Sequence, residues 1–245
     1  MATGKNAGKY TSILIDGYDV SGDSASVNLK VDGKRMDATA LASGTMENLY
    51  GIPQISATGN MWFSNAANSG SYTLLKAQQA RVVAVSFGIR AVVAPGDPCM
   101  AGQWMCQLNS YPIAMTEASK AVLDIDGTDP TIADAIAVPF GVVLHENKQE
   151  TATANGTTID NLASSANGAR GVLMVTAAGG TWAITIQHDT ASNMATATTL
   201  MTFSSNGTAI TGEVKTVSGT VNRYVRAVMT RTSGNFNGYV ALCRG

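Results

Sequence analysis

Ionisable side chains are scarce in this chain of 245 residues. Asp, Glu, Lys and Arg make up 13% of it, and the formal net charge is −1 at pH 7. A typical soluble domain has about a quarter of its residues charged. So low and balanced a charge excludes long-range electrostatic capture of nucleic acid.

The surface must therefore be built largely from Thr, Ser, Asn, Gly and Ala. These short uncharged side chains lose little hydration and little rotamer freedom on contact. Interface cores are likewise depleted in charge. We therefore expect packing into an assembly, with a neutral, secreted-type β domain as the alternative.

Cysteine and histidine, which build many metal and catalytic sites, are also rare. The three cysteines, Cys99, Cys106 and Cys243, allow no even disulfide framework. They show no CxxC spacing and have no histidine close by in sequence, which argues against zinc. An odd number of cysteines is typical of reduced thiols in a protein made in a cytoplasm.

Long apolar runs are missing as well. No stretch approaches the ~18 apolar residues of a membrane span, and the opening "MATGKNAGKY" has no apolar segment of signal-peptide length. We expect a soluble chain that is not exported by the usual route. The Asn-Gly-Thr sequences at Asn155 and Asn206 then indicate turns and not glycosylation sites.

Short strand-like segments dominate what is present. Ile13 to Ile15 precede Asp16-Gly17, and Val27, Leu29 and Val31 alternate with polar residues before Asp32-Gly33, which predicts a tight turn there. Residues 81–93 form a β-branched run typical of a central strand. Residues 171–189 predict a hairpin that turns at Gly179-Gly180. The best helix candidate is residues 71–81, with Ser71 as its N-cap.

These segments recur about every ten residues, with turn signals between them. This spacing predicts an all-β fold with at most one or two short helices, a sandwich or barrel in place of βαβ units. The composition changes near residues 127–141. We therefore predict two β domains in tandem, residues 1–127 and residues 128–245.

The pair His188–Asp189 is the first candidate for chemistry. His188 follows Trp182, Ile184 and Ile186 in strand alternation, and Asp189 begins the turn "DTASN". No G-x-S-x-G or similar nucleophile context accompanies them. We therefore interpret His188, like His145, as a strand-end residue with local hydrogen bonds.

Three further sets of residues have a structural interpretation that is simpler than a binding site. Asp124, Asp126 and Asp129 lack the later ligands of a calcium loop, so we expect a strand followed by a turn at Asp126-Gly127. Arginines near the C-terminus would alternate between strand faces, and tryptophans would anchor cores or interfaces more readily than bind sugar. These are Arg223, Arg226 and Arg231, and Trp62, Trp104 and Trp182. The sequence predicts no catalytic, cofactor-binding or metal site and no cofactor.

The C-terminal half resembles a pattern common in virion proteins of tailed bacteriophages, in "GTTIDNLASSANGARGVLMVTAAGGTWAITIQHDTASNMATATTLMTF" and "VSGTVNRYVRAVMTR". The first half resembles the strand–turn–strand opening of phage major tail (tail tube) proteins, in "ILIDGYDVSGDSASVNLKVDGKRMDATAL" and "NLYGIPQISATGNMWFS". The resemblance covers most of the chain. One departure is "DTASNMATATTL" after "QH", which lacks the tryptophan usual there and weakens any transfer of a carbohydrate-binding role.

The resemblance implies a non-enzymatic virion subunit, assembled in the cytoplasm of a host bacterium, that forms stacked rings around a DNA-conducting lumen. Its partners would be copies of itself and other phage structural proteins, with DNA only as passing cargo and no membrane. The alternatives are a capsid decoration or cement protein, a carbohydrate-binding or receptor-binding virion module and, least favoured, an enzyme. We expect the subunit contacts in residues 1–10, 32–51 and 94–111.

Overall fold

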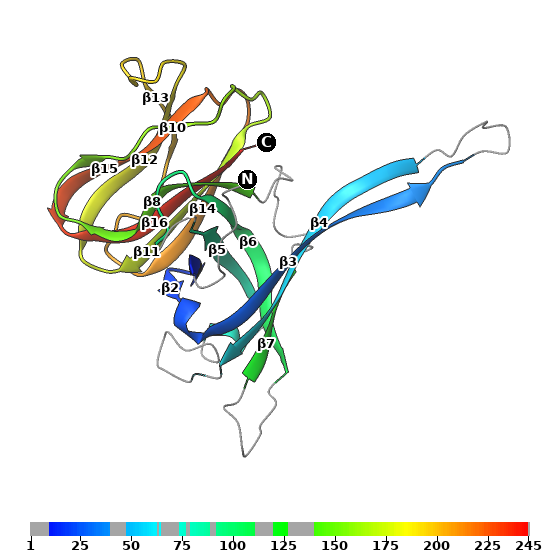
Figure 1. The fold of residues 1–245 in the computed structure, drawn as a ribbon. Helices are drawn as coiled ribbons and strands as arrows, with labels where there is room; N and C mark the ends of the chain where they lie inside the picture. The colour runs from blue at the N-terminus through cyan, green and yellow to red at the C-terminus, as the bar shows by residue number, and fades with distance from the viewer. Residues whose placement is uncertain are drawn as a thin grey trace, which may run out of the picture. The chain divides into compact units, whose positions relative to one another are not determined.

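The computed structural model describes residues 10–39, 48–62, 64, 74–76, 79–88, 92–110, 120–126 and 140–244 (Figure 1). Most of the described residues are in antiparallel β-strands, which confirms the predicted all-β class. Contacts divide the chain into two compact units. Unit 1 contains residues 1–22, 81–103 and 134–245, and unit 2 contains residues 23–80 and 104–133.

Unit 1 holds most of the strands. They are β1 (Thr11–Ile15), β2 (Tyr18–Asp19), most of β5 (Gln79–Phe87), the start of β6 (Pro98–Ser110), β8 (Phe140–Glu150), β9 (Ala154–Asn155), β10 (Ile159–Asp160), β11 (Ala169–Ala177), β12 (Gly180–Asp189), β13 (Thr198–Thr202), β14 (Thr211–Val217), β15 (Tyr224–Gly234) and β16 (Phe236–Arg244). Unit 2 holds β3 (Ser24–Asp37), β4 (Asn48–Trp62), β7 (Lys120–Asp126) and the end of β6. A short 3-10 turn, Ser21–Asp23, precedes β3.

The units are interleaved along the chain, so they are not the same division as residues 1–127 and 128–245. The consecutive division stays a prediction about independent folding, which expression of residues 128–245 alone would test.

Two sheets build unit 1. The larger follows the order β14-β11-β16-β8-β6-β5-β1-β2, and the smaller follows β10-β15-β12-β13, with β9 also paired to β15. The larger sheet curls so that its two ends meet. Gly17, in the turn between β1 and β2 at one end, lies against the Val175 carbonyl of β11 and the Thr211 backbone of β14 at the other end. A Cβ atom at Gly17 would come within 2.2 Å of that carbonyl oxygen, so a side chain there would prevent the approach.

The larger sheet buries side chains on both of its faces. On β11, Leu173 and Val175 belong to the core shared with the smaller sheet, whereas Val172 and Met174 belong to a second core on the opposite face. The alternation continues on β16. Strands buried on both faces read as unbroken apolar runs, which explains the sequences "GVLMV" and "YVALC".

The predicted hairpin at Gly179-Gly180 is wrong. Strand β11 pairs with β14 and β16, whereas β12 pairs with β13 and β15, so the chain crosses between sheets at this point. The crossing from β15 to β16 lies against it, because the Asn235 N–H donates to the Gly179 carbonyl at 3.0 Å. A Cβ atom at Gly180 would come within 2.1 Å of the Ser233 carbonyl oxygen. The glycines therefore serve a close backbone approach and not a hairpin turn.

A further predicted turn is wrong, and a predicted helix ends earlier than expected. Strand β3 continues through Asp32-Gly33, where the register shifts between Gly33 and Arg35 opposite Pro53. Proline gives the ladder no N–H, so a bulge marked by glycine replaces the predicted turn. In the predicted helix of residues 71–81, only Leu74 and Leu75 are described as helical, and residues 79–81 belong to β5. The β-branched residues that follow draw this end into the strand.

Candidate assembly site

Asp189 serves the fold of its own loop. It is buried, and its carboxylate accepts hydrogen bonds from the Ala191 N–H at 3.1 Å, the Thr196 N–H at 2.9 Å and the Thr196 hydroxyl at 3.0 Å. The Ala191 bond, the strongest influence, lowers the pKa of Asp189 together with the Thr196 bonds. The predicted turn after β12 is confirmed, and this carboxylate holds it closed.

His188 ends β12 as predicted, and it too makes a local hydrogen bond. Its Nδ1 accepts the Asn222 N–H at 3.0 Å, so the neutral ring carries its proton on Nε2. Burial lowers the pKa of His188 below its usual 6.5, against the opposing effect of the Asp189 carboxylate. The ring is therefore neutral at pH 7 and fixed as an acceptor.

His145 does not lie at a strand end, as the sequence suggested, but in the interior of β8. It is buried, with Nδ1 3.0 Å from the Gly238 carbonyl oxygen and Nε2 3.1 Å from a Glu150 carboxylate oxygen. Its ring lies 5.9 Å from that of Phe236. These contacts connect β8 with β16, which is a structural role.

The three cysteines are buried free thiols. Cys99 on β6 and Cys243 on β16 are both register partners of Gly141 on β8, which lies between them. The hydrogen bond with Cys243, and then burial, raise the pKa of the Cys99 thiol well above its usual value. Neutral buried thiols are poor nucleophiles and poor metal ligands.

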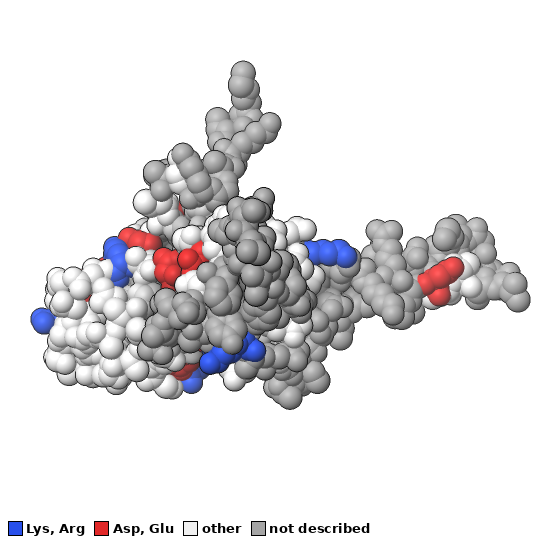
Figure 2. Space-filling view, turned by 90° about the horizontal axis from the view of Figure 1, so that it is seen from below, with Lys and Arg blue, Asp and Glu red and all other residues white. Residues whose placement is uncertain are grey.

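The three arginines near the C-terminus each have partners. Arg223 binds the Asp160 carboxylate through two nitrogens, both at 2.6 Å, and Arg226 contacts the Gln187 side-chain oxygen at 2.8 Å. Arg231 donates to the Gly234 carbonyl at 2.7 Å. On the face shown in Figure 2, the described Lys, Arg, Asp and Glu residues are few and dispersed among uncharged ones. No basic patch for phosphate emerges from these residues.

The remaining candidates are separated by burial. Trp104 and Trp182 are buried, whereas Trp62, at the end of β4, is 37% exposed. Asp124 and Asp126 lie on β7, opposite Thr58 and Ser56 of β4, and Asp129 lies outside the described residues.

Among the described side chains, no group of three or more His, Cys, Asp or Glu could hold a metal ion. The described residues contain no helix that is long and apolar enough to span a membrane.

Unit 2 has an open sheet edge. Strand β3, with 14 residues, pairs only with β4 among the described strands. Strand β4 pairs on its other side with β7, and this pairing involves only residues 56–62. Residues 32–37 of β3 and 48–54 of β4 thus form a two-stranded ribbon without a third described strand, which we call the distal ribbon (Figure 1).

The distal ribbon coincides with one predicted contact region, residues 32–51, of which residues 40–47 lie outside the described part. An isolated two-stranded ribbon is marginally stable in water, and a long open edge offers unpaired N–H and C=O groups to another strand. The ribbon is therefore a candidate contact surface.

The other two predicted contact regions, residues 1–10 and 94–111, give less support for a contact surface. Residues 1–9 lie outside the described part of the chain. Most of residues 94–111 lie in strand β6, which begins at Pro98. Its residues Cys99 to Ala101 are buried in unit 1.

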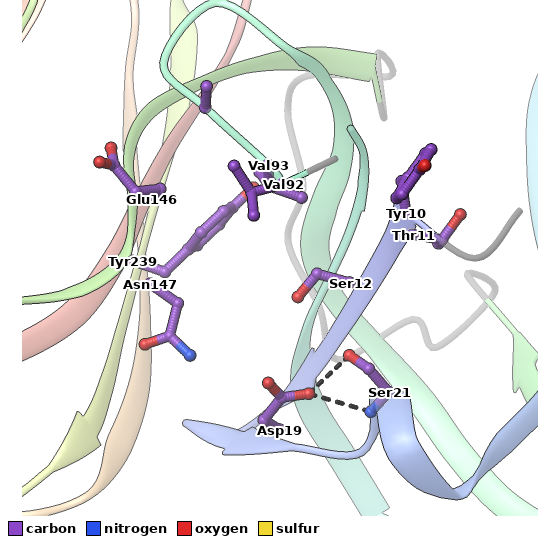
Figure 3. Close-up of a pocket in the computed structure, with 11 residues that line it drawn as sticks. Tyr10, Thr11, Ser12, Asp19, Ser21, Val92, Val93, Glu146, Asn147 and Tyr239 are labelled. Atoms are coloured by element: carbon purple, nitrogen blue, oxygen red, sulfur yellow. Dashed lines mark hydrogen bonds between the residues drawn. The ribbon is translucent and has the colours of Figure 1, made fainter. Parts of the chain in front are cut away.

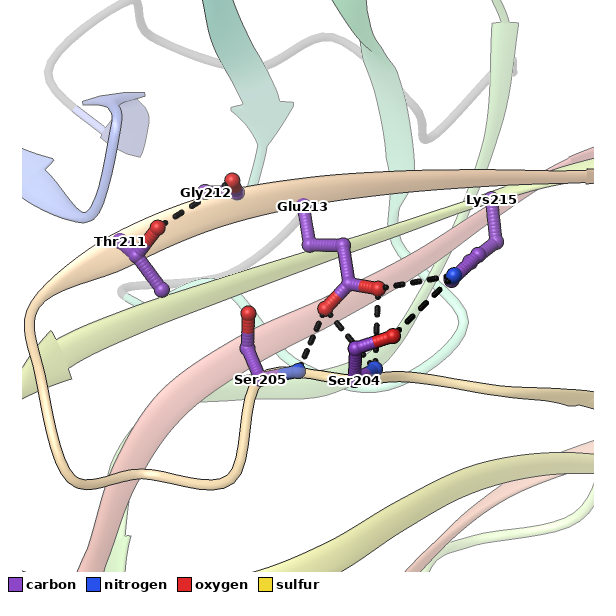
Figure 4. Close-up of polar contacts among 6 residues, drawn as sticks. All are labelled: Ser204, Ser205, Thr211, Gly212, Glu213 and Lys215. Carbon is purple, nitrogen blue, oxygen red and sulfur yellow. Dashed lines mark hydrogen bonds and ion pairs between the residues drawn. The ribbon is translucent and has the colours of Figure 1, made fainter.

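The opposite edge of the larger sheet, strand β14, is partly covered by its own chain. The Glu213 carboxylate accepts the N–H groups of Ser204 at 2.9 Å and Ser205 at 2.6 Å, and Lys215 contacts both Glu213 and Ser204 (Figure 4). Burial acts to raise the pKa of Glu213, but these hydrogen bonds outweigh it and lower the pKa. Glu213 thus fixes the connection from β13 to β14 beside this edge.

A groove of about 510 Å³ opens on unit 1 (Figure 3). Apolar side chains, Val92, Val93 and Tyr239, lie on one side of it, and Asp19, which accepts hydrogen bonds from Ser21, lies on the other. Its described lining includes no Lys, Arg or His. The Ser21 hydroxyl in this lining donates to the Asp19 carboxylate and accepts the Ile13 N–H, so both groups hold the turn after β2. The described lining includes no group of three or more metal ligands.

Comparison with known proteins gives remote similarities. No family model matches the chain, and no curated protein matches it. A chain of the virion of a native gene transfer agent particle is 14% identical with a TM-score of 0.36, and the match covers 51% of this chain and 95% of that one. The SPP1 Dit protein, described with the hub adsorption apparatus of phages that infect Gram-positive hosts, is 10% identical with a TM-score of 0.29 over 95% of this chain and 98% of that one. A chain of infectious bursal disease virus, Gx strain, is 10% identical with a TM-score of 0.24 over 95% and 67%.

Proposed function

We propose that this protein is a structural, non-enzymatic subunit of a bacteriophage virion. More specifically, we propose that it is the major tail protein, whose copies form stacked rings around a DNA-conducting lumen. The proposal includes assembly in the host cytoplasm and contacts with copies of itself and with other virion proteins.

The distal ribbon carries this proposal. Its two strands lack a third described strand, and β3 presents an open edge along 14 residues. Natural proteins shorten, charge or cover such edges to avoid association. An edge of this length with no further described strand suits a chain that meets another copy, and a head-to-tail contact closes into a ring when the rotation permits.

The scarcity of free positive charge is consistent with a lumen through which DNA passes without binding tightly. The described C-terminal arginines are each occupied by partners within the chain. Binding of a phosphate backbone requires several free cations that displace counterions. A wall with few free cations would let DNA pass.

Imaging combined with sedimentation tests the proposal. The purified full chain should form rings or tubes at high concentration, visible by negative stain. Discrete small oligomers that bind capsid shells would favour a decoration protein instead. A chain that stays monomeric at all concentrations would contradict both assignments.

A shortened variant tests the role of the distal ribbon. Replacing residues 32–54 by Asn-Gly connects Val31 to its register partner Ile55 by a turn suited to hairpins. We expect the variant to keep the β-sheet circular dichroism of the parent but to form no tubes. Tubes of unchanged length and frequency would contradict the role of the ribbon.

A matched control changes an exposed turn in unit 1. Thr220, next to Gly219, is exposed and lies outside any strand. Thr220→Ala should therefore assemble as the parent does.

A further inference from the structure

Leu162 occupies a strained three-residue turn. Its φ is +68°, and the Ala163 N–H donates to the Asn161 carbonyl at 2.8 Å across it. A turn of this kind with positive φ is rare and strained, and a residue with a Cβ atom is disfavoured there. Glycine or asparagine would adopt this conformation more easily.

The side chain of Leu162 gains nothing from burial in its own chain. It is 80% exposed, the highest value among the described large hydrophobic residues that are exposed. Leu162 therefore combines an unfavourable backbone conformation with an apolar side chain in water. The fold itself requires neither feature.

The turn is nevertheless held firmly. The Asp160 carboxylate accepts the Leu162 N–H at 2.7 Å and is itself bound by Arg223 through two nitrogens. Arg244 donates to the Asn161 carbonyl at 3.0 Å and to the Ala163 carbonyl. A rigidly mounted side chain loses little entropy on binding. This turn thus presents one leucine at a fixed position.

The groove of unit 1 offers a complementary surface. Val92, which lines it, is 70% exposed and second only to Leu162 among these residues. The volume of about 510 Å³ lies in the range of sites that accept small ligands. The groove is therefore large enough for an apolar side chain with its flanking backbone.

The charges of the two surfaces are also complementary. The lining of the groove includes Asp19 and Glu146 but no described basic residue, although Lys148 contacts Glu146 at 2.9 Å from outside the lining. The turn is flanked by Arg223 and Arg244, with Asp160 as the counterion of the first. This difference in sign favours the approach of one surface to the other.

We propose that Leu162 of one copy inserts beside Val92 in the groove of a second copy. This inference rests on the proposed self-assembly and specifies one of its contacts. Because turn and groove are different surfaces, each copy can offer one and accept the other, which allows the contact to repeat through a ring or filament.

Cysteine cross-linking between separately made variants tests this pair. Leu162→Cys and Val92→Cys are purified apart, and each is oxidised alone and after mixing under assembly conditions. The native cysteines are buried, so they should not react. We expect a disulfide-linked dimer only in the mixture, detected on a non-reducing gel.

Three results have different consequences. Rings or tubes without a cross-linked dimer in the mixture would overturn this contact and leave the proposed function intact. A dimer formed by either variant alone would overturn the pairing of Leu162 with Val92. Absence of any association would contradict both the contact and the proposed function.

Leu162→Gly separates binding from folding. Glycine relieves the backbone strain, so the thermal midpoint should stay equal or rise, while self-association should weaken by about tenfold or more through loss of the apolar contact. Leu162→Met, which stays apolar, should associate nearly as the parent does. A lower midpoint with unchanged association would show that Leu162 serves the fold and would overturn the proposal.

Discussion

The larger sheet of unit 1 and the distal ribbon of unit 2 are both antiparallel β-structure, yet they satisfy their strands in opposite ways. Strands β11 and β16 are paired on both sides and buried on both faces. The distal ribbon has one pairing and no third described strand. Unit 1 can therefore be explained by contacts within the chain, whereas the ribbon is the region that we propose to be completed by another copy.

Substitutions in the larger sheet and in β3, the strand that continues into the distal ribbon, should differ most in their effect on stability. Leu173→Ala on β11 removes a fully buried side chain between the sheets and should lower the free energy of unfolding by about 3 kcal/mol. Val27→Ala on β3, which is only partly buried, should cost less than about 1 kcal/mol. Urea unfolding of monomeric protein measures both. Equal losses would remove the contrast between the regions.

A smaller loss of stability is expected at Glu213, which holds the connection between β13 and β14 in unit 1. Glu213→Gln keeps the size of the side chain but removes the charge that strengthens the hydrogen bonds from Ser204 and Ser205. We expect a loss of about 1 kcal/mol and faster amide exchange in residues 203–210. Thr216→Ala, at an exposed position on the same strand, is the matched control. Unchanged exchange would indicate that the carboxylate does not hold this connection.

Acid should act on the same groups. The pKa values of Asp189, Glu213 and Asp160 are lowered in the fold, that of Asp160 from 3.8 to about 2 by its hydrogen bonds with Arg223. The stability that each contributes is complete above its usual pKa and is lost as the pH falls through the lowered value. The thermal midpoint should therefore fall between about pH 5 and pH 2, less steeply in Glu213→Gln. An equal slope in this variant would exclude Glu213 from the acid response.

The sequence predicted the kind of structure better than its connections. Alternating residues such as Trp182, Ile184 and Ile186 identified a strand with one buried face, and all three are buried. The hairpin at Gly179-Gly180 failed because glycines that allow two chain crossings to touch look the same in sequence as glycines in a tight turn. Which strands pair depends on contacts far apart in the chain, and local pattern does not contain that information.

The candidate surfaces show the same limit. The sequence predicts one contact region at residues 32–51, and part of that region is the distal ribbon. Leu162 was missed, because "DNLASS" gives no sign that leucine adopts positive φ or stays exposed. The contacts that hold this turn are long-range, because Arg223 binds Asp160 from 63 residues away in sequence and Arg244 donates to Ala163 from 81 residues away.

Amide hydrogen exchange along β3 tests most directly whether the ribbon is completed by another copy. The full chain is labelled as free subunits and as assembled particles, and peptides from residues 24–37 are compared with peptides from β11. We predict that the β3 amides exchange fast in free subunits and at least about tenfold more slowly in particles, while β11 is protected in both. Equal exchange of β3 in the two states would contradict the assignment of this ribbon to a contact between copies.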